Sequence, residues 1–371
     1  MKKVFVHAYL NYNLGDDLMV QILCRRYPYV RFSVIADERY KEVYKNVPNL
    51  KVYLYNGKQA KFWNRLWKRL KGAEDGFRKM LLRTSDVTIH IGGSSFVQHY
   101  DDYSAFFNTD ATMRRLSKKM LAIGQNFGPY TDENYYRQYY ELLGRYDGVT
   151  FRDQASYRLF EALPNVKKAA DVVFCCGREM ILEADRPREK KKVLFSVIRM
   201  EGRDGKFAIS PYAEAYGRFI VALAERYLKK GYEVEFISFC GPQGDSYAAA
   251  EMISRIGEEY RSRVSQYDYE TDIEACIRHF DEAEIVVGTR FHSVILGWLK
   301  GKKVLPIVYD TKTQNIMDDF QYDTYVRLEQ LQDMDVEQLI SKIHGMPKGQ
   351  VRRLAADAKN QFWAADDILK R

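Results

Sequence analysis

The sequence predicts an α/β protein built from two doubly wound domains. Short apolar, β-branched runs alternate with segments of helical periodicity, the pattern of parallel sheets covered by helices. The predicted strands repeatedly end in polar or glycine-rich turns, which gather at the carboxyl edge of such a sheet. A charged, proline-interrupted stretch at 183–192 separates two such series. We therefore expect domains at 1–184 and 185–345, and a last segment, 346–371, with a helix able to cross back to the first domain.

The first domain begins with a strand followed by the turn NLGDD at 13–17 and a helix at 18–27. Gly15 permits a tight turn, and Asp16 or Asp17 can cap the helix. A GGSS turn at 92–95 would let backbone N–H groups approach a ligand closely. No turn matches GxGxxG and no P-loop lysine is present, so a dinucleotide or P-loop site is not supported. The predicted strands of this domain are 3–8, 30–36, 50–54, 86–91, 119–125, 148–151 and 169–174.

The second domain repeats the alternation of strands and helices. Its predicted strands are 193–197, 233–239, 284–288 and 303–308. Its predicted helices are 212–230, 247–260, 271–280 and one from about 294, and a further helix, 349–369, is predicted in the last segment. Thr289 or Ser293 can cap the helix that follows the third strand.

The most informative residues of the second domain lie at strand ends. Arg290 and His292 fall in the turn after the strand 284–288, where the N-terminus of the next helix favours an anion. Arg199 and Lys312 follow two other strands. Three cations and an imidazole in one cleft would bind a small dianion such as a phosphorylated carboxylate. A histidine that only caps the helix, with an arginine paired to a surface carboxylate, is the structural alternative.

Two such domains facing each other would form a cleft with carboxyl-edge loops on both walls. The first domain would contribute the polar residues at its own strand ends. These residues are Asp16, Asp17, Arg152 and Asp153.

Composition points to a soluble globular protein with anionic partners. The 371 residues include 46% hydrophobic and 29% charged residues, and the formal net charge is +8. We expect neither a membrane span nor a signal peptide. The five cysteines are scattered without metal-type spacing, so we expect a reduced, cytoplasmic protein with no metal site. Nucleic acid is not an expected partner because no binding motif accompanies the positive charge.

Basic residues concentrate at 58–83, where aromatic and leucine side chains recur at helical spacing among Lys and Arg. One interpretation is a helix that lies on an anionic membrane surface. The other is an ordinary helix that packs its aromatic residues inward and exposes a basic face.

An ordered set of motifs resembles the polysaccharide pyruvyl transferase family from about residue 9 to residue 320. Each motif is weak alone, but their order and spacing together are fairly specific. The motifs are NLGDD at 13–17, IGGS at 91–94, QNFGP at 125–129, FRDQAS at 151–156, Asp171, SVIR at 196–199, GTRFHS at 288–293 and YDTK at 309–312.

This resemblance implies a GT-B-like architecture, with two Rossmann-like domains facing a cleft. It also implies transfer of the enolpyruvyl group of phosphoenolpyruvate to a sugar, usually as a cyclic pyruvate ketal on two hydroxyls. Phosphoenolpyruvate is the donor substrate, and no cofactor or metal is expected. In similar proteins the acceptor is often a saccharide on a polyprenyl pyrophosphate lipid at the cytoplasmic face of the membrane, which would make the protein peripheral there.

By the same resemblance, His292 is the general acid, while Arg199 and Arg290 hold the anionic groups of the donor. Lys312 would bind its phosphate, and Arg152 matches an arginine that also serves the reaction. Asp16 or Asp17 would orient or deprotonate the acceptor, although helix capping explains each of them equally well. Acceptor binding is expected in the first domain, at Asn13, Asp16, Asp17, Gly93, Ser94, Ser95 and Asn126.

Two other functions compete with this interpretation. A glycosyltransferase of the same architecture would use a nucleotide-sugar donor, and would need a nucleotide site with a carboxylate for the ribose. A non-catalytic carbohydrate-binding or scaffold protein would retain its function when His292 is replaced by alanine. The compact dianion site around Arg290, His292 and Lys312 favours the pyruvyl transferase.

Overall fold

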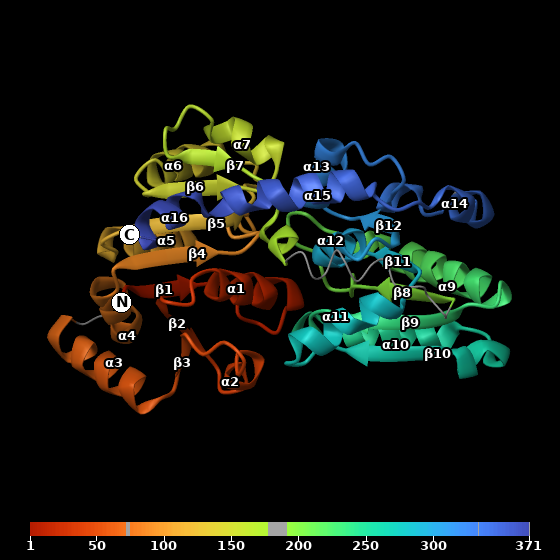
Figure 1. The fold of residues 1–371 in the computed structure, drawn as a ribbon, viewed down its shortest axis with the longest axis horizontal. Coiled ribbons are helices and arrows are strands. Elements are labelled where there is room, and N and C mark those ends of the chain that lie inside the picture. The colour runs from red at the N-terminus through yellow and green to blue at the C-terminus, as the bar shows by residue number, and fades with distance from the viewer. Residues whose placement is uncertain (72–74, 177–190, 333, 371) are drawn as a thin grey trace. The chain divides into compact units, whose positions relative to one another are not determined.

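The computed structural model describes residues 1–71, 75–176, 191–332 and 334–370 (Figure 1). These residues form two compact units. Unit 1 comprises Met1–Leu10, Asp16–Val172 and Asp357–Arg371, and unit 2 comprises Asn11–Gly15 and Val173–Ala356. The expected boundary at 184/185 and most of the expected linker at 183–192 lie outside the described residues. The division differs from the expected domains at residues 11–15, which belong to unit 2, and at the end of the chain, where Asp357–Arg371 belong to unit 1.

Within its described residues, unit 1 contains a seven-stranded parallel sheet in the order β3-β2-β1-β4-β5-β6-β7. The order reverses between β1 and β4, as in Rossmann-like sheets, and ligands bind at the carboxyl ends beside such a reversal. β4 is buried along its whole length, as expected for a central strand covered on both faces. The strands are β1 (Lys3–His7), β2 (Arg31–Ala36), β3 (Leu50–Leu54), β4 (Val87–Ile91), β5 (Met120–Gln125), β6 (Gly148–Phe151) and β7 (Val166–Lys168).

The helices of unit 1 connect these strands, and Figure 1 shows them around the sheet. They are α1 (Leu14–Arg26), α2 (Tyr40–Val43), α3 (Lys58–Lys71), α4 (Gly76–Thr84), α5 (Ser104–Leu116), α6 (Glu133–Leu143), α7 (Gln154–Phe160) and α16 (Trp363–Leu369). The chain end is fixed to the sheet through Gln361, whose side chain accepts from Gly124 N and donates to Ala169 O.

Unit 2 repeats the same strand order with six parallel strands in its described residues, β10-β9-β8-β11-β12-β13. The reversal lies between β8 and β11, so the turns after these two strands lie side by side. The strands are β8 (Lys192–Ser196), β9 (Glu233–Ser238), β10 (Val264–Asp268), β11 (Ile285–Gly288), β12 (Lys303–Val308) and β13 (Val326–Arg327). The helices are α9 (Ala213–Lys229), α10 (Asp245–Arg255), α11 (Ile273–Glu282), α12 (Phe291–Leu299), α13 (Thr311–Phe320), α14 (Val336–Lys342) and α15 (Lys348–Asp357).

Several sequence-based boundaries were wrong. The predicted strand at 169–174 is instead a 3-10 turn, Val172–Cys175, and the strand precedes it at Val166–Lys168, where it pairs with β6. The edge strand β10 was missed because its sequence, VSQYD, is half polar. The single helix predicted at 349–369 is divided into α15, the 3-10 segment Ala358–Phe362 and α16. Short apolar runs are buried in both strands and helices, so the sequence pattern alone could not distinguish a strand from a helical turn.

Among the described residues, no helix has both the length and the hydropathy that a membrane crossing requires.

Candidate functional site

The turn after β11 presents Arg290 and His292 at the carboxyl edge of the sheet of unit 2. The predicted caps of the next helix were wrong. Arg290 is the N-cap residue, with an extended backbone and no side-chain capping bond. The Ser293 hydroxyl instead donates to the Arg290 carbonyl over 2.6 Å, and Thr289 bonds to the Tyr216 hydroxyl at 2.8 Å. His292 therefore lies in the first turn of α12 rather than in the preceding loop.

Arg290 is held by Gln243 in the loop after β9 and by Asp245, the first residue of α10. Its Nε donates to Asp245 Oδ2 over 2.7 Å and its Nη2 to Asp245 Oδ1, while Nη1 donates to Gln243 Oε1 over 2.7 Å. Arg290 is 7% exposed and Asp245 is fully buried. Burial alone would lower the pKa of Arg290, but the Asp245 carboxylate outweighs it and raises that pKa. A paired charge attracts a substrate dianion less than the isolated guanidinium that the sequence suggested.

His292 is packed against the segment Asn11–Gly15, which belongs to the same unit. A Cβ added at Gly15 would lie 1.7 Å from His292 Nδ1, so the ring fills the space above that glycine. The segment is fixed by Leu14 N, which donates to Phe239 O over 3.1 Å, and by a bridge between Asn13 and Cys240. Gly15 is therefore more than a turn residue, because it admits the imidazole to its position.

Asn13 caps α1. Its Oδ1 accepts from Gly15 N over 3.1 Å, and the helix begins at Leu14. The prediction that Asp16 or Asp17 caps a helix starting at 18 was therefore wrong, because both lie inside the first turn.

A surface pocket of about 420 Å³ lies on unit 2, beside the loop that holds Arg290. It is lined by Arg199, Glu201, Arg203, Gly241, Pro242, Gln243, Gly244 and Tyr247. The Arg199 side chain is 51% exposed, and its Nε is 3.9 Å from Glu201 Oε2, a distance that makes a weak ion pair. Gln243 both lines the pocket and accepts from Arg290, so it connects the pocket to the buried ion pair.

Lys312 lies in the first turn of α13, after β12. Its Nζ is 3.0 Å from Asp310 Oδ2, and it lies 5.8 Å from the centre of the Tyr309 ring. Asp310 caps α13 by accepting from Thr313 N. Burial would raise the pKa of Asp310, but Lys312 and the Thr313 hydrogen bonds outweigh it and lower the pKa. β12 pairs with β11 in parallel, so the turn that leads to Lys312 follows the strand next to the one that leads to Arg290.

Arg152 belongs to a buried cluster of unit 1. Its Nη1 donates to Asp171 Oδ2 over 2.9 Å and its Nη2 to Asn126 Oδ1 over 2.7 Å. The side chains of Arg152 and Asp171 are 2% and 1% exposed. Gly93 packs on the guanidinium, since a Cβ there would lie 2.3 Å from Nη2. These contacts give Arg152 a structural task, and its predicted part in donor binding stays a prediction.

Four predicted acceptor residues lie in the turns after β4 and β5 of unit 1, namely Gly93, Ser94, Ser95 and Asn126, whereas Asn13, expected in the first domain, belongs to unit 2. Asn126 N donates to Gly93 O over 2.8 Å, which joins the two turns. Asp16 is half-buried, and its Oδ1 lies 3.8 Å from a Cβ added at Gly92, a position that is also near Ser95. Asp17 is fully buried, whereas Ser94 is exposed.

Sequence analysis missed three residues of the site in unit 2. Arg203 lines the pocket, and Gln243 and Asp245 hold Arg290. The motif CGPQGD at 240–245 follows a strand and was visible as a polar turn, but nothing in the sequence connects it with Arg290, 45 residues later. In the part of the chain that the structure describes, no group of three or more His, Cys, Asp or Glu is arranged to hold a metal ion.

Solved structures similar to this chain are glycosyltransferases and related sugar enzymes of GT-B type. A glycosyltransferase from Rickettsia africae matches with a TM-score of 0.57 and 10% identity, over 100% of this chain and 98% of that one. HepE from Anabaena, solved with UDP-glucose, matches with a TM-score of 0.55 and 12% identity, over 99% and 95%. At such identities the likeness concerns the fold alone, which is GT-B-like with two Rossmann-like domains.

Sequence comparison identifies the family. The amylovoran biosynthesis protein AmsJ of Erwinia amylovora is 23% identical over 254 residues, which is 64% of this chain and 60% of AmsJ. The match thus spans less than two thirds of that relative. The family model described as polysaccharide pyruvyl transferase matches residues 13–311, which include Asn13, Arg152, Arg199, Arg290 and His292. This chain therefore belongs to the polysaccharide pyruvyl transferase family.

Proposed function

We propose that the protein transfers the pyruvyl group of phosphoenolpyruvate to a sugar of a surface-polysaccharide precursor and forms a cyclic pyruvate ketal. The observation that carries the proposal is the pocket of unit 2, where Arg199 and Arg203 face a space of about 420 Å³. Two guanidinium groups suit the carboxylate and phosphate of a compact donor. Family membership and the relation to a protein of amylovoran biosynthesis support a role in polysaccharide assembly.

The buried ion pair of Arg290 and Asp245 suggests that the cations of unit 2 have different roles. Asp245 and Gln243 accept hydrogen bonds from Arg290, so Arg290 fixes the loop 240–245 that forms one wall of the pocket. Arg199, which is half exposed, and Arg203 are then the residues that contact the donor's anionic groups. Lys312, after β12, binds the phosphate of the donor and stabilises this phosphate as it leaves.

His292 would supply the proton that starts the reaction. Protonation of the methylene carbon of phosphoenolpyruvate leaves an oxocarbenium-like centre on the neighbouring carbon, to which a sugar hydroxyl adds with loss of its proton. A second hydroxyl then bonds to the same carbon as the bond to phosphate breaks, and phosphate carries away the remaining proton. Asp16 and Asp17 both stay predicted to orient or deprotonate the acceptor; Asp16 is half-buried and Asp17 is fully buried.

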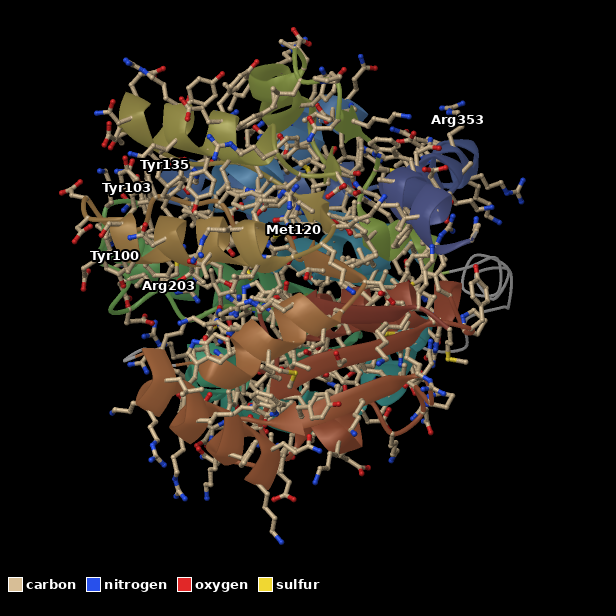
Figure 2. The ribbon with its side chains drawn as sticks, turned by 90° about the vertical axis from the view of Figure 1, so that its left-hand side faces the viewer. Tyr100, Tyr103, Met120, Tyr135, Arg203 and Arg353 are labelled. Atoms are coloured by element: carbon tan, nitrogen blue, oxygen red, sulfur yellow. The ribbon has the colours of Figure 1, made fainter. Side chains whose placement is uncertain are left out.

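Exposed aromatic residues of unit 1 suit a sugar acceptor. Tyr100 and Phe106 stack with ring centres 6.1 Å apart, and they are 62% and 56% exposed. Figure 2 shows Tyr100 at the surface with Tyr103 and Tyr135 nearby, and the last two rings pack edge to face. Exposed aromatic faces are the usual platforms for the apolar faces of sugar rings.

Donor binding tests the proposal most directly. Calorimetry would compare phosphoenolpyruvate with UDP-glucose for the wild type, Arg199→Ala and Arg203→Ala. Losing a charge-assisted hydrogen bond should weaken phosphoenolpyruvate binding by about 10- to 100-fold in either variant. Arg353→Ala, an exposed arginine of α15, is the matched control and should bind normally. Binding of UDP-glucose without phosphoenolpyruvate would refute the proposal in favour of a nucleotide-sugar glycosyltransferase.

The proton transfer has its own readout. In D₂O, the methyl group of the pyruvyl product should carry one deuterium, detectable by NMR. His292→Gln should still bind phosphoenolpyruvate but should transfer its pyruvyl group at least about 100-fold more slowly. Unchanged transfer by His292→Gln would exclude His292 as the general acid.

A further inference from the structure

Helix α3 has a solvent-exposed face that is both apolar and strongly basic. Its sequence, KQAKFWNRLWKRLK, contains six Lys and Arg and no Asp or Glu. The helix already buries one side in unit 1, where it packs against α4 (Figure 1). Ala60 is buried on that side, and Asn64 Oδ1 accepts from Phe77 N over 2.8 Å. Aromatic residues in a helix usually pack on the core. In α3, only one face of the helix packs in this way.

The two tryptophans belong to the packed side. A Cβ added at Gly76 would lie 2.3 Å from Trp67 Cβ and 2.6 Å from the Trp63 carbonyl oxygen, so α4 begins directly against them. Arg83 of α4 lies over the Trp67 ring, 4.9 Å from its centre. These contacts fix the rotation of α3 and thereby determine which residues face solvent.

The outward side carries large apolar residues that the fold does not cover. Phe62 is 61% exposed and Leu70 is 66% exposed, and Leu66, between them at a spacing of four, is partly exposed. Residues four apart follow one another along one side of a helix. The exposed cations of the same helix lie beside this stripe; they are Lys58, Lys61, Arg65, Lys68 and Arg69.

We propose that α3 is a membrane-surface helix that docks unit 1 onto an anionic lipid bilayer. A bilayer interface matches both properties of the exposed side, because acyl chains take up apolar side chains while anionic headgroups attract Lys and Arg. An acidic protein surface would match the charge without a need for Phe62 and Leu70. The inference concerns a different surface from the pocket of unit 2, so it stands independently of the proposed donor.

Vesicle co-sedimentation tests this surface with the full chain. The protein should bind vesicles that contain about 30% phosphatidylglycerol, bind pure phosphatidylcholine at least about tenfold more weakly, and be released by salt. Arg65→Glu/Arg69→Glu should weaken binding to anionic vesicles by at least about tenfold, since each basic residue near such a surface adds to the attraction and each glutamate opposes it. Arg352→Glu/Arg353→Glu, exposed residues of α15, change the net charge equally and should bind as the wild type does.

The apolar contribution needs a separate variant. Phe62→Ala/Leu70→Ala retains every charge and should still weaken vesicle binding several-fold, whereas Phe207→Ala, at an exposed phenylalanine of unit 2, should not. Brominated acyl chains should quench the fluorescence of a tryptophan introduced on the exposed side by Phe62→Trp, and this quenching should be lost when Arg65→Glu/Arg69→Glu is added. Equal effects of the α3 and α15 charge reversals would overturn the proposal, as would binding of single-stranded DNA in preference to anionic vesicles.

Discussion

The imidazole of His292 occupies the space that a side chain at Gly15 would need. A Cβ at Gly15 would lie 1.7 Å from Nδ1 and 2.6 Å from the next ring atoms, so the two residues cannot both keep their positions if Gly15 is replaced. Gly15 is held from both sides, by Asn13 Oδ1 on its own N–H and by the bond between Leu14 N and Phe239 O. The position of the predicted general acid thus depends on a glycine 277 residues earlier in the sequence.

Gly15→Ala should consequently slow pyruvyl transfer and also lower the stability of the protein. Displacing the ring by about 1 Å is expected to slow transfer by about 100-fold, while overpacking lowers the free energy of unfolding by about 1–3 kcal/mol. Steady-state kinetics and urea unfolding would separate the two effects. Gly205→Ala is the control, because a Cβ there meets nothing within 4 Å. Normal turnover by Gly15→Ala would show that the ring need not occupy this position.

Removing the partner of Arg290 should destabilise the protein strongly. Asp245→Ala leaves a guanidinium that is 7% exposed without its carboxylate, and we expect the free energy of unfolding to fall by about 3–5 kcal/mol. The double variant Asp245→Leu/Arg290→Met removes both charges and should recover most of that loss. Urea unfolding of the three proteins measures the difference. A cost below about 1 kcal/mol for Asp245→Ala would mean that Arg290 is well solvated.

The glycine at position 244 should control the donor pocket through Arg199. A Cβ at Gly244 would lie 2.7 Å from Arg199 Cδ, so Gly244→Ala pushes this side chain out of place. We expect the Kd for phosphoenolpyruvate to rise about tenfold, as for Arg199→Ala. Gly231→Ala is a close control: its φ of +82° matches the +83° of Gly244, but a Cβ there meets nothing within 4 Å. Equal affinities for the two variants would contradict the assignment of Arg199 to the donor.

A buried carboxyl in unit 1 should make stability depend on pH. Burial raises the pKa of Asp110 to about 7, although the Tyr139 hydroxyl, which donates to Oδ2 over 2.8 Å, lowers it. The neighbouring His90, with Nδ1 3.9 Å from Asp110 Oδ1, has a pKa that burial lowers well below its usual value, so neither group favours its charged form. The pair is therefore a contact of neutral groups near pH 6 rather than an ion pair.

The sign of the effect follows from proton binding. Between about pH 4 and pH 7 the folded state holds a proton on Asp110 that the unfolded state has lost, so this group's contribution to stability falls as pH rises, by about 1.4 kcal/mol per pH unit. Asp110→Asn removes this pH-dependent contribution of Asp110. The free energy of unfolding of the variant, relative to that of the wild type, should therefore rise with pH between about pH 4 and pH 7. His7 and His90, whose lowered pKa values act in the opposite direction, cancel in this difference. A difference that does not vary with pH would mean that the Asp110 pKa is normal.

The sequence by itself determined where the chemistry would lie along the chain. Apolar runs predicted β6 and β12 with their observed bounds, because a strand buried between helices has little freedom in composition. The edge strand β3 was also predicted with its observed bounds, although it is only partly buried. Turns after those runs then fell at the carboxyl edges of two parallel sheets, so the positions of Arg152, Arg199, Arg290 and Lys312 followed from strand ends alone. The order of short motifs likewise predicted the family, which the family model confirms.

Only the tertiary structure decided what each of these side chains contacts. The sequence did not predict that Asp245 and Gln243 accept hydrogen bonds from Arg290, and the expected binding of a substrate anion by Arg290 stays a prediction. Arg203 entered the site because its loop borders the pocket of unit 2. The outward direction of Phe62 and Leu70 depends on how α3 is rotated against α4. Periodicity shows how often a residue type recurs along the chain. Ion pairs and packing depend instead on distances between segments that lie far apart in the sequence, and folding sets those distances.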